Sequence, residues 1–210
     1  DVNTEAYTRE NSAQNFPDLL KKTDFIVHLA GENRPEDEDD FELVNSGLTS
    51  LICDEIRLVE KDIPIILASS TQAEHDNLYG KSKLSAEIAI KNLANDTGNS
   101  AYIYRLPGVF GKWCKPNYNS VVATFCHNIS HDLPIQVSDS SFELSLVYID
   151  EVVEEFVKVI QGVKDGGKAP IVLPEYKITL GDLADQIKIF KESRDSLITE
   201  KVGGGLIRKL

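Results

Sequence analysis

Short apolar runs alternate with longer amphipathic segments along the first half of the chain. Residues 24–30, 63–69 and 101–106 are apolar runs of strand length, while 41–60 and 78–95 carry apolar residues at helical spacing. This alternation is typical of βαβ units, in which helices cover both faces of a parallel sheet. The pattern predicts an α/β fold, a Rossmann-like doubly wound parallel sheet.

The second half of the chain is more mixed. Apolar spacing predicts helices at 118–130 and 180–193, the latter capped by Thr179, and alternation predicts a strand at 143–149. Asp150 is a good N-cap for a helix that runs to residue 161. A short strand is expected at 171–173. These elements predict a small C-terminal lobe beside the sheet.

Composition excludes several classes of protein. The 210 residues include 22 basic and 34 acidic side chains, a net charge of −12, which argues against nucleic-acid binding because phosphate affinity comes from Lys and Arg. No apolar run approaches the roughly 18 residues that a membrane span needs. The three cysteines lack metal-ligand spacing, so we expect reduced thiols, no metal site and a cytoplasmic protein.

One segment carries the residues of a proton relay. Tyr79 and Lys83 are four residues apart on an expected helix, so they share one face. A tyrosine can protonate the alkoxide formed in carbonyl reduction, and a nearby ammonium lowers the phenol's pKa from about 10. Ser70 or Thr71, at the carboxyl end of a strand, can hold the substrate oxygen, since ligands bind at that edge of α/β sheets.

A Tyr and a Lys at this spacing are often only a packed aromatic ring and a solvated ammonium. Here the order of features favours catalysis: an apolar strand, Ser-Ser-Thr, a short polar connector, then Tyr-x-x-x-Lys at the start of a helix. His28 lies within an apolar run, where a core histidine is more common than a catalytic one.

Several further strings resemble the extended short-chain dehydrogenase/reductases that act on nucleotide-activated sugars, the NAD-dependent epimerase/dehydratase family. The resemblance covers residues 24 to 190. Its strings are His28-Leu29-Ala30-Gly31, Asn45 in the following helix, Arg105-Leu-Pro-Gly-Val-Phe-Gly111 and Tyr148-Ile-Asp-Glu-Val152.

Other strings are similar to one subgroup, the reductase domains of bifunctional capsular polysaccharide enzymes that form UDP-2-acetamido-2,6-dideoxy-talose. These strings are His28 to Pro35, Ser69 to Ala73 and Phe110 to Ser120. The resemblance implies reduction of the 4-keto group of a UDP-linked 6-deoxy-N-acetylhexosamine, in capsule or O-antigen precursor synthesis. It implies NADPH as the cofactor, with NAD less favoured, a UDP-sugar substrate and a homodimer.

The resemblance also implies roles for individual residues. The catalytic residues would be Ser70, Tyr79 and Lys83, and the alignment of Gln72-Ala73 favours Ser70 over Thr71. Cofactor contacts are expected at His28, Leu29, Ala30, Gly31, Asn45, Tyr79, Lys83, Leu106, Pro107 and Val109. Substrate contacts are expected at Arg34, Thr71, Gln72, Gly108, Lys112 and Asn119, although a solvated loop explains Lys112 and Asn119 equally well and Gly108 stands where the family has asparagine.

The family's first strand and its glycine-rich phosphate loop have no counterpart in this sequence, and neither does the cupin domain that follows the reductase in the subgroup. The resemblance therefore implies a partial Rossmann cofactor domain at 1–110, a mixed substrate lobe with returning Rossmann elements at 111–193, and a tail or linker at 194–210. We expect the chain to begin inside a larger protein and to bind NADPH poorly alone, because the phosphate loop supplies amide donors for the pyrophosphate.

Two other functions are compatible with the sequence. Epimerases and dehydratases with tightly held NAD usually place acidic residues after the Ser/Thr, where this chain has Thr71-Gln72-Ala73. A non-catalytic Rossmann-like module commonly loses the Tyr or the Lys, and both are present here. Net NADPH consumption separates the reductase from the first alternative, and calorimetry with NADPH separates it from the second.

Overall fold

The computed structural model describes residues 2–8, 10–11, 16–35, 37, 41–163, 170–198 and 203–210. The chain divides into two compact units. The first comprises Asp1–Arg105 with Gly166–Pro170, and the second comprises Leu106–Asp165 with Ile171–Leu210.

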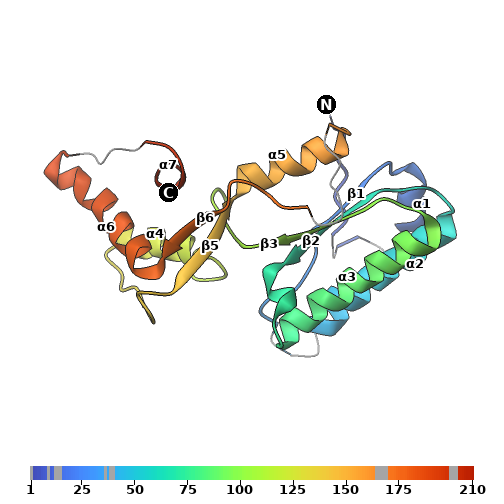
Figure 1. The fold of residues 1–210 in the computed structure, drawn as a ribbon, viewed down its shortest axis with the longest axis horizontal. Helices are drawn as coiled ribbons and strands as arrows, with labels where there is room; N and C mark the ends of the chain where they lie inside the picture. The colour runs from blue at the N-terminus through green and yellow to red at the C-terminus, as the bar shows by residue number, and fades with distance from the viewer. Residues whose placement is uncertain are drawn as a thin grey trace. The chain divides into compact units, whose positions relative to one another are not determined.

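The first unit contains a three-stranded sheet in the order β1-β2-β3 (Figure 1). The strands are β1 (Ile26–His28), β2 (Ile65–Ser70) and β3 (Ala101–Leu106). Strand β1 runs parallel to β2, with Ile26 opposite Ile65. Parallel neighbours require a crossover, and the helical segment between residues 41 and 59 provides it, as the alternation predicted. The α/β, Rossmann-like prediction is therefore confirmed for this unit.

Helices α2 (Leu48–Val59) and α3 (Leu78–Thr97) lie side by side in the first unit (Figure 1), and the short helix α1 (Phe16–Lys22) contacts α2. Two less regular turns precede the longer helices. A π-helical segment, η2 (Phe41–Gly47), leads into α2, and a 3-10 turn, η3 (Thr71–Glu74), lies between β2 and α3. The buried apolar side chains between the sheet and these helices are Leu20, Ile52, Cys53, Ile56, Ile63, Ile65, Leu67, Ala86, Ile90 and Leu93.

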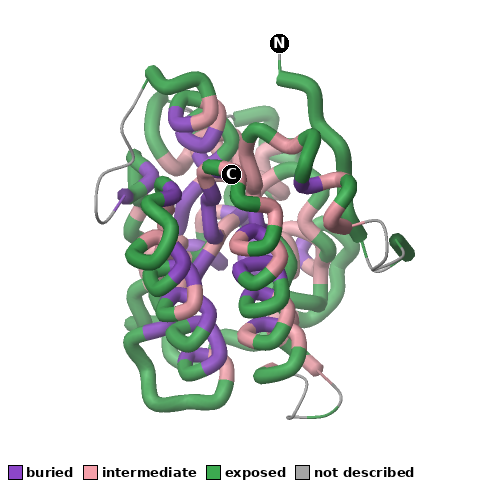
Figure 2. The backbone as a smooth tube through the Cα atoms, turned by 90° about the vertical axis from the view of Figure 1, so that its right-hand side faces the viewer, coloured by how far each residue is buried: buried purple, intermediate pink, exposed green. Residues whose placement is uncertain are grey.

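The second unit has its own sheet, in which β4 (Gly108–Phe110) runs parallel to β5 (Glu143–Tyr148) and β6 (Tyr176–Thr179) runs antiparallel to β5. Its helices are α4 (Val121–Ser130), α5 (Ile149–Ile160), α6 (Leu180–Ser196) and α7 (Leu206–Lys209). Figure 2 shows that buried residues alternate with intermediate and exposed ones along the helices. The core of this unit comprises Phe110, Val122, Phe125, Ile129, Leu146, Leu180, Leu183, Ala184 and Ile187.

Some expected elements of the second unit are wrong. The strand expected at 171–173 is absent from those residues, and the strand lies at β6 instead, where Tyr176 and Ile178 pair with β5. Helix α5 begins at Ile149 with Tyr148 as its N-cap, so Asp150 is inside the first turn and not the cap. The predicted cap at Thr179 is confirmed, since its Oγ1 accepts a hydrogen bond from the backbone N of Asp182 at 3.1 Å.

Candidate active site

Helix α3 places Tyr79 and Lys83 on one face near its start. The Asn77 side chain caps the helix by accepting a hydrogen bond from the Gly80 backbone N at 2.8 Å. This cap puts Tyr79 in the first turn and Lys83 one turn later. The Lys83 Nζ lies 5.8 Å from the centroid of the Tyr79 ring. The relay pair expected from the sequence is therefore close together.

Ser70 is the last residue of β2 and faces the start of α3. Its hydroxyl caps η3 by accepting from the backbone N of Gln72 at 3.1 Å, and the Ser70 side chain lowers the pKa of Tyr79. Within the described residues, Thr71 makes no such bond and is exposed, as is Gln72. Of the two hydroxyls that the sequence offered, that of Ser70 is the one that influences the pKa of Tyr79.

The absence of a side chain at Gly80 allows this pairing. A Cβ on Gly80 would lie 2.3 Å from the Gln72 backbone O and 2.5 Å from the His75 backbone O. Non-bonded contacts of a Cβ this short are essentially never found in proteins, so any larger residue at position 80 would push α3 away from η3. Gly80 therefore sets the distance between the helix that carries Tyr79 and the strand end that carries Ser70.

The pKa of Tyr79 departs from the sequence-based expectation. Burial raises its pKa above the ordinary value near 10, and the Ser70 hydrogen bond only partly opposes that rise. Tyr79 is consequently a protonated phenol at neutral pH, which suits a proton donor.

Asn45 joins the end of β1 to helix α3. Its Nδ2 donates to the Glu32 backbone O and to the Ser82 Oγ, both at 2.9 Å, and its Oδ1 accepts from the Glu32 backbone N at 2.8 Å. The side chain is buried in the π-helical η2 segment, a type of helix that is frequent at functional sites. These side-chain hydrogen bonds join Glu32, in the segment after β1, to Ser82 of α3. Asn45 therefore holds the segment after β1 close to Lys83.

The backbone of Gly31 lies close to the side chains of Asn45 and Lys83. A Cβ there would lie 2.7 Å from both the Asn45 Oδ1 and the Lys83 Nζ. The two residues before it, Leu29 and Ala30, are exposed and connect β1 to Gly31. The strand-end segment predicted from the sequence thus borders the Lys83 ammonium directly.

Lys83 is a buried ammonium, with only 6% of its surface exposed. Within the described part of the chain, its Nζ has no carboxylate partner and no hydrogen-bond acceptor. Burial lowers its pKa. Donors left free beside a glycine backbone fit the hydroxyls of a nucleotide ribose, so these residues are compatible with a nicotinamide dinucleotide.

His28 is buried below the site and is not free to act as an acid or base. Its Nε2 lies 2.9 Å from the Thr49 Oγ1, and that hydroxyl donates its own proton to the Asn45 backbone O at 2.6 Å. Thr49 must therefore accept from His28, which fixes the neutral tautomer with hydrogen on Nε2. Burial, followed by the charge of Lys83, lowers the pKa of His28 to about 4. The core interpretation of its side chain fits this geometry.

The other residues predicted for the site are distributed over both units. Arg34 is exposed in the first unit, while Leu106, Pro107, Gly108, Val109, Lys112 and Asn119 belong to the second. Lys112 forms an ion pair with Asp150 at 2.7 Å, and the pair raises the pKa of Lys112. Gly108 lies tightly against β5, because a Cβ there would be 3.2 Å from the Ser145 backbone O.

Two polar residues of the site were not singled out from the sequence. Ser82 accepts from Asn45 and donates to the Tyr79 backbone O at 2.8 Å, and Glu87 binds Ser69 at 2.7 Å. Both lie on α3 near Lys83, but a serine or glutamate in a helix is usually solvated. Only the spacing of four residues between Lys83 and Glu87 hinted at a shared face.

Among the described residues, no helix has the length and apolarity of a membrane span, and no cluster of three or more His, Cys, Asp or Glu has the arrangement of a metal site.

Comparison with known proteins gives one consistent result. The sequence profile of the NAD dependent epimerase/dehydratase family matches residues 6–173. The UDP-2-acetamido-2,6-beta-L-arabino-hexul-4-ose reductase of Pseudomonas aeruginosa is 51% identical over 204 residues, which are 97% of this chain and 55% of that protein. The chain thus spans about half the length of this relative.

Solved structures agree with the sequence match. The capsular polysaccharide assembling protein CapF from Staphylococcus aureus is 42% identical with a TM-score of 0.84, over 96% of this chain and 55% of CapF. The UDP-glucuronic acid 4-epimerase from Bacillus cereus, solved in complex with NAD, is 18% identical with a TM-score of 0.72, over 87% of this chain and 63% of that one, and shares the fold. The chain belongs to the NAD-dependent epimerase/dehydratase family.

Proposed function

We propose that this chain carries the proton-donating part of a reductase that acts on the 4-keto group of a UDP-linked 6-deoxy-N-acetylhexosamine, in the synthesis of capsular or O-antigen polysaccharide precursors. The observation that carries the proposal is the contact of Ser70, Tyr79 and Lys83 at the carboxyl end of β2. The identity to a UDP-sugar 4-ketose reductase supports the substrate class.

The proposed roles follow from the protonation states of the site. NADPH, when bound, supplies the hydride that reduces the carbonyl carbon. Ser70 donates a hydrogen bond to the carbonyl oxygen, and Tyr79, protonated at neutral pH, transfers its phenolic proton to the alkoxide that forms there. The buried Lys83 ammonium then stabilises the phenolate, because an opposite charge is most effective where water is excluded.

The proposed cofactor contacts in the first unit are Gly31, Asn45 and Lys83, together with the backbone of residues 28 to 30. Asn45 uses its amide within the protein and therefore acts by holding the Gly31 segment in place. Among the described residues no carboxylate or other acceptor contacts the Lys83 Nζ, so its donors would bind the ribose. We propose NADPH in preference to NADH on the resemblance to the subgroup. We also propose that Arg34, Thr71 and Gln72, and in the second unit Lys112 and Asn119, contact the UDP-sugar.

The Tyr79→Phe variant of the full-length protein tests this function. Its rate of NADPH oxidation with the UDP-4-keto sugar should fall by at least about 100-fold, because the proton donor is lost, while calorimetry should show unchanged NADPH binding. Tyr102→Phe is a matched control, since Tyr102 stacks on Phe25 at 6.2 Å in the same unit. Turnover retained in Tyr79→Phe, or product formed by the unmodified protein without net NADPH oxidation, would refute the proposal.

We further propose that the protein forms a homodimer through helices α2 and α3. These helices pack side by side and expose large apolar side chains, namely Leu51, Leu58, Leu84 and Ile88. A second copy offers the same apolar face, which is the requirement of a two-fold interface.

A further inference from the structure

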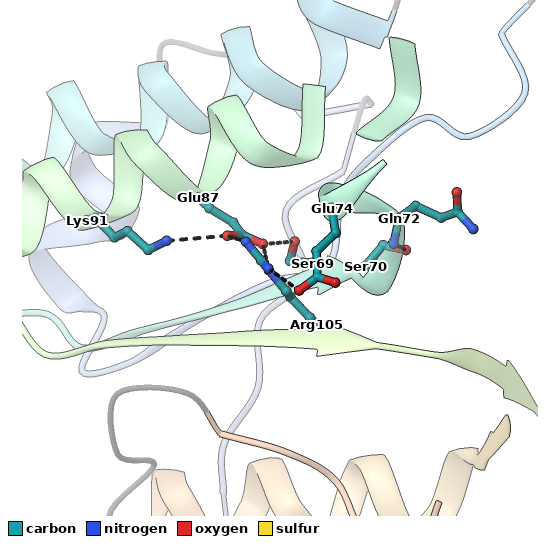
Figure 3. A network of polar contacts seen from close by, with 7 residues as sticks. All are labelled: Ser69, Ser70, Gln72, Glu74, Glu87, Lys91 and Arg105. Atoms are coloured by element: carbon teal, nitrogen blue, oxygen red, sulfur yellow. Dashed lines mark hydrogen bonds and ion pairs between the residues drawn. The ribbon is translucent and has the colours of Figure 1, made fainter. Parts of the chain in front are cut away.

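A buried carboxylate lies beside the candidate site without contacting Tyr79 or Lys83. Glu87 of α3 is only 1% exposed, and its Oε1 accepts hydrogen bonds from the Ser69 Oγ at 2.7 Å and the Arg105 Nε at 2.8 Å (Figure 3). Its Oε2 accepts from the Arg105 Nη2 at 2.7 Å and forms an ion pair with Lys91 at 3.4 Å. The guanidinium and the carboxylate therefore form a two-pronged pair, the most directional type of ion pair.

Glu87 is fully committed as a charged acceptor. Burial alone would raise its pKa, but the hydrogen bonds from Arg105 and Ser69 and the nearby positive charges outweigh burial and lower it. A buried carboxylate with this many donors has one favourable orientation. The groups bonded to Glu87 are thus fixed relative to α3.

Each group bonded to this pair belongs to an element of the candidate site. Ser69 directly precedes Ser70, so its bond to Glu87 ties the end of β2 to the helix that carries Tyr79 and Lys83. The Arg105 Nη1 also donates to Glu74 Oε1 at 2.9 Å, which ties η3, the turn after Ser70, to the end of β3 (Figure 3).

We propose that Glu87 and Arg105 are a positioning pair that holds the Ser70 hydroxyl against the Tyr79 phenol. The inference rests on the proposed reductase function. A positioning role and a purely stabilising role predict different results. If the pair positions the site, its loss misaligns Tyr79 and Ser70 and leaves substrate binding largely intact. Misplacement of reacting groups by about 1 Å typically lowers a rate by about 100-fold.

The test uses three variants of the full-length protein, Ser69→Ala, Arg105→Gln and Glu87→Gln. The matched control is Arg57→Gln, because Arg57 also bridges two carboxylates, Asp54 at 3.0 Å and Asp96 at 2.9 Å, and its side chain is 33% exposed, as is that of Arg105. Asp96 lies near the end of α3, so the control removes a comparable pair on the same helix away from Tyr79.

Two readouts are measured on each variant. The first is kcat and KM for NADPH-dependent reduction of the UDP-4-keto sugar. The second is the ionisation of Tyr79, followed by NMR of ¹³C-labelled tyrosine with Tyr79→Phe to assign the resonance. Ser69→Ala and Arg105→Gln should lower kcat by about 10- to 100-fold with little change in KM. The pKa of Tyr79 should rise in both, because the Ser70 hydrogen bond that lowers it is weakened.

Arg57→Gln should change neither readout. Ser69→Ala with unchanged kcat and unchanged Tyr79 ionisation would overturn the proposal, as would equal losses in Arg57→Gln. Where Glu87→Gln fails to fold, Ser69→Ala decides, since it removes one hydroxyl and leaves the ion pair. If the unmodified protein does not oxidise NADPH, the proposed function fails, and the ionisation of Tyr79 still decides the positioning role.

Discussion

Two basic side chains of the site, His28 and Lys83, are almost inaccessible to water. Burial lowers the pKa of each, and the charge of Lys83 lowers that of His28 further, to about 4. At neutral pH the histidine is therefore neutral. The two groups are not interchangeable, because only Lys83 borders Gly31 and Tyr79.

The pKa of His28 predicts a loss of stability in acid. Between pH 6.5 and about 4, the unfolded chain binds a proton at this residue and the folded chain does not, so the free energy of unfolding decreases by about 3 kcal/mol as the pH falls through that range. His28→Gln preserves an N–H donor for Thr49 and removes the titration. Urea unfolding at several pH values should show a flatter acid limb in this variant.

A control separates this residue from the rest of the chain. His127 and His131 lie at the end of α4 in the second unit and are not buried. His127→Gln should leave the acid limb as it is in the unmodified protein. An acid limb of the His28→Gln variant that matches the unmodified protein would contradict the assignment.

The sequence predicted the proposed reacting residues more readily than the residues that surround them. Tyr79, Lys83 and Ser70 were recognisable because proton transfer restricts both the residue type and the spacing on a helix. Ser82 and Glu87 were not, because their partners Asn45 and Ser69 lie 37 and 18 residues away. A polar residue that acts through such distant contacts has no local pattern.

At the scale of elements, the sheet edge and the start of α3 are held together by backbone contact at Gly80. Gly80→Ala should destabilise the protein by about 1–3 kcal/mol, as overpacking of a tight contact does, and should lower the reductase rate by separating Tyr79 from Ser70. Chemical denaturation and the NADPH oxidation assay measure the two effects.

Gly47→Ala is the matched control, because Gly47 is also helical, with φ of −64°, and a Cβ there would meet only an ordinary contact at 3.7 Å. This substitution should stabilise the protein by about 0.4–1 kcal/mol by restricting the unfolded chain. Equal behaviour of the two variants would show that the Gly80 contact is not a constraint.

Element type and approximate bounds were predictable where packing follows a simple period, and the positions of short strands were not. Strand β2 and helix α3 lie within a residue or two of their expected limits. Strand β6 was misplaced because Val172 is a buried residue of an irregular segment, which resembles a short strand in sequence. Strand β4, only three residues long, follows Pro107 and is defined by its pairing with β5, which no local pattern reports.

At the scale of the whole molecule, the exposed apolar side chains of α2 and α3 predict association. Leu51→Lys combined with Ile88→Lys should convert the proposed dimer to a monomer in sedimentation experiments, because each charge would be buried in the interface without a partner. Val153→Lys, at an exposed apolar position of α5, is the control and should leave the mass unchanged. A monomeric unmodified protein would refute the dimer.

The division of the chain into two units limited prediction at this scale. The first unit follows the strand and helix alternation and was anticipated as Rossmann-like. In the second unit, Leu206 of α7 and Leu210 after it pack against the core, and Lys209 pairs with Glu151 at 3.1 Å, although the sequence predicted a tail or linker at 194–210. A four-residue helix has no detectable period, so its docking depends entirely on tertiary contacts.

The buried ammonium of Lys83 has a consequence for anyone who engineers this protein. A buried ammonium with no carboxylate partner among the described residues costs folding free energy, so replacing Lys83 with an uncharged residue of similar length should raise thermal stability. A library selected for heat resistance alone would therefore enrich substitutions at this position. With the role proposed for Lys83 above, such a selection would yield well-folded proteins without reductase activity, so activity has to be screened in parallel.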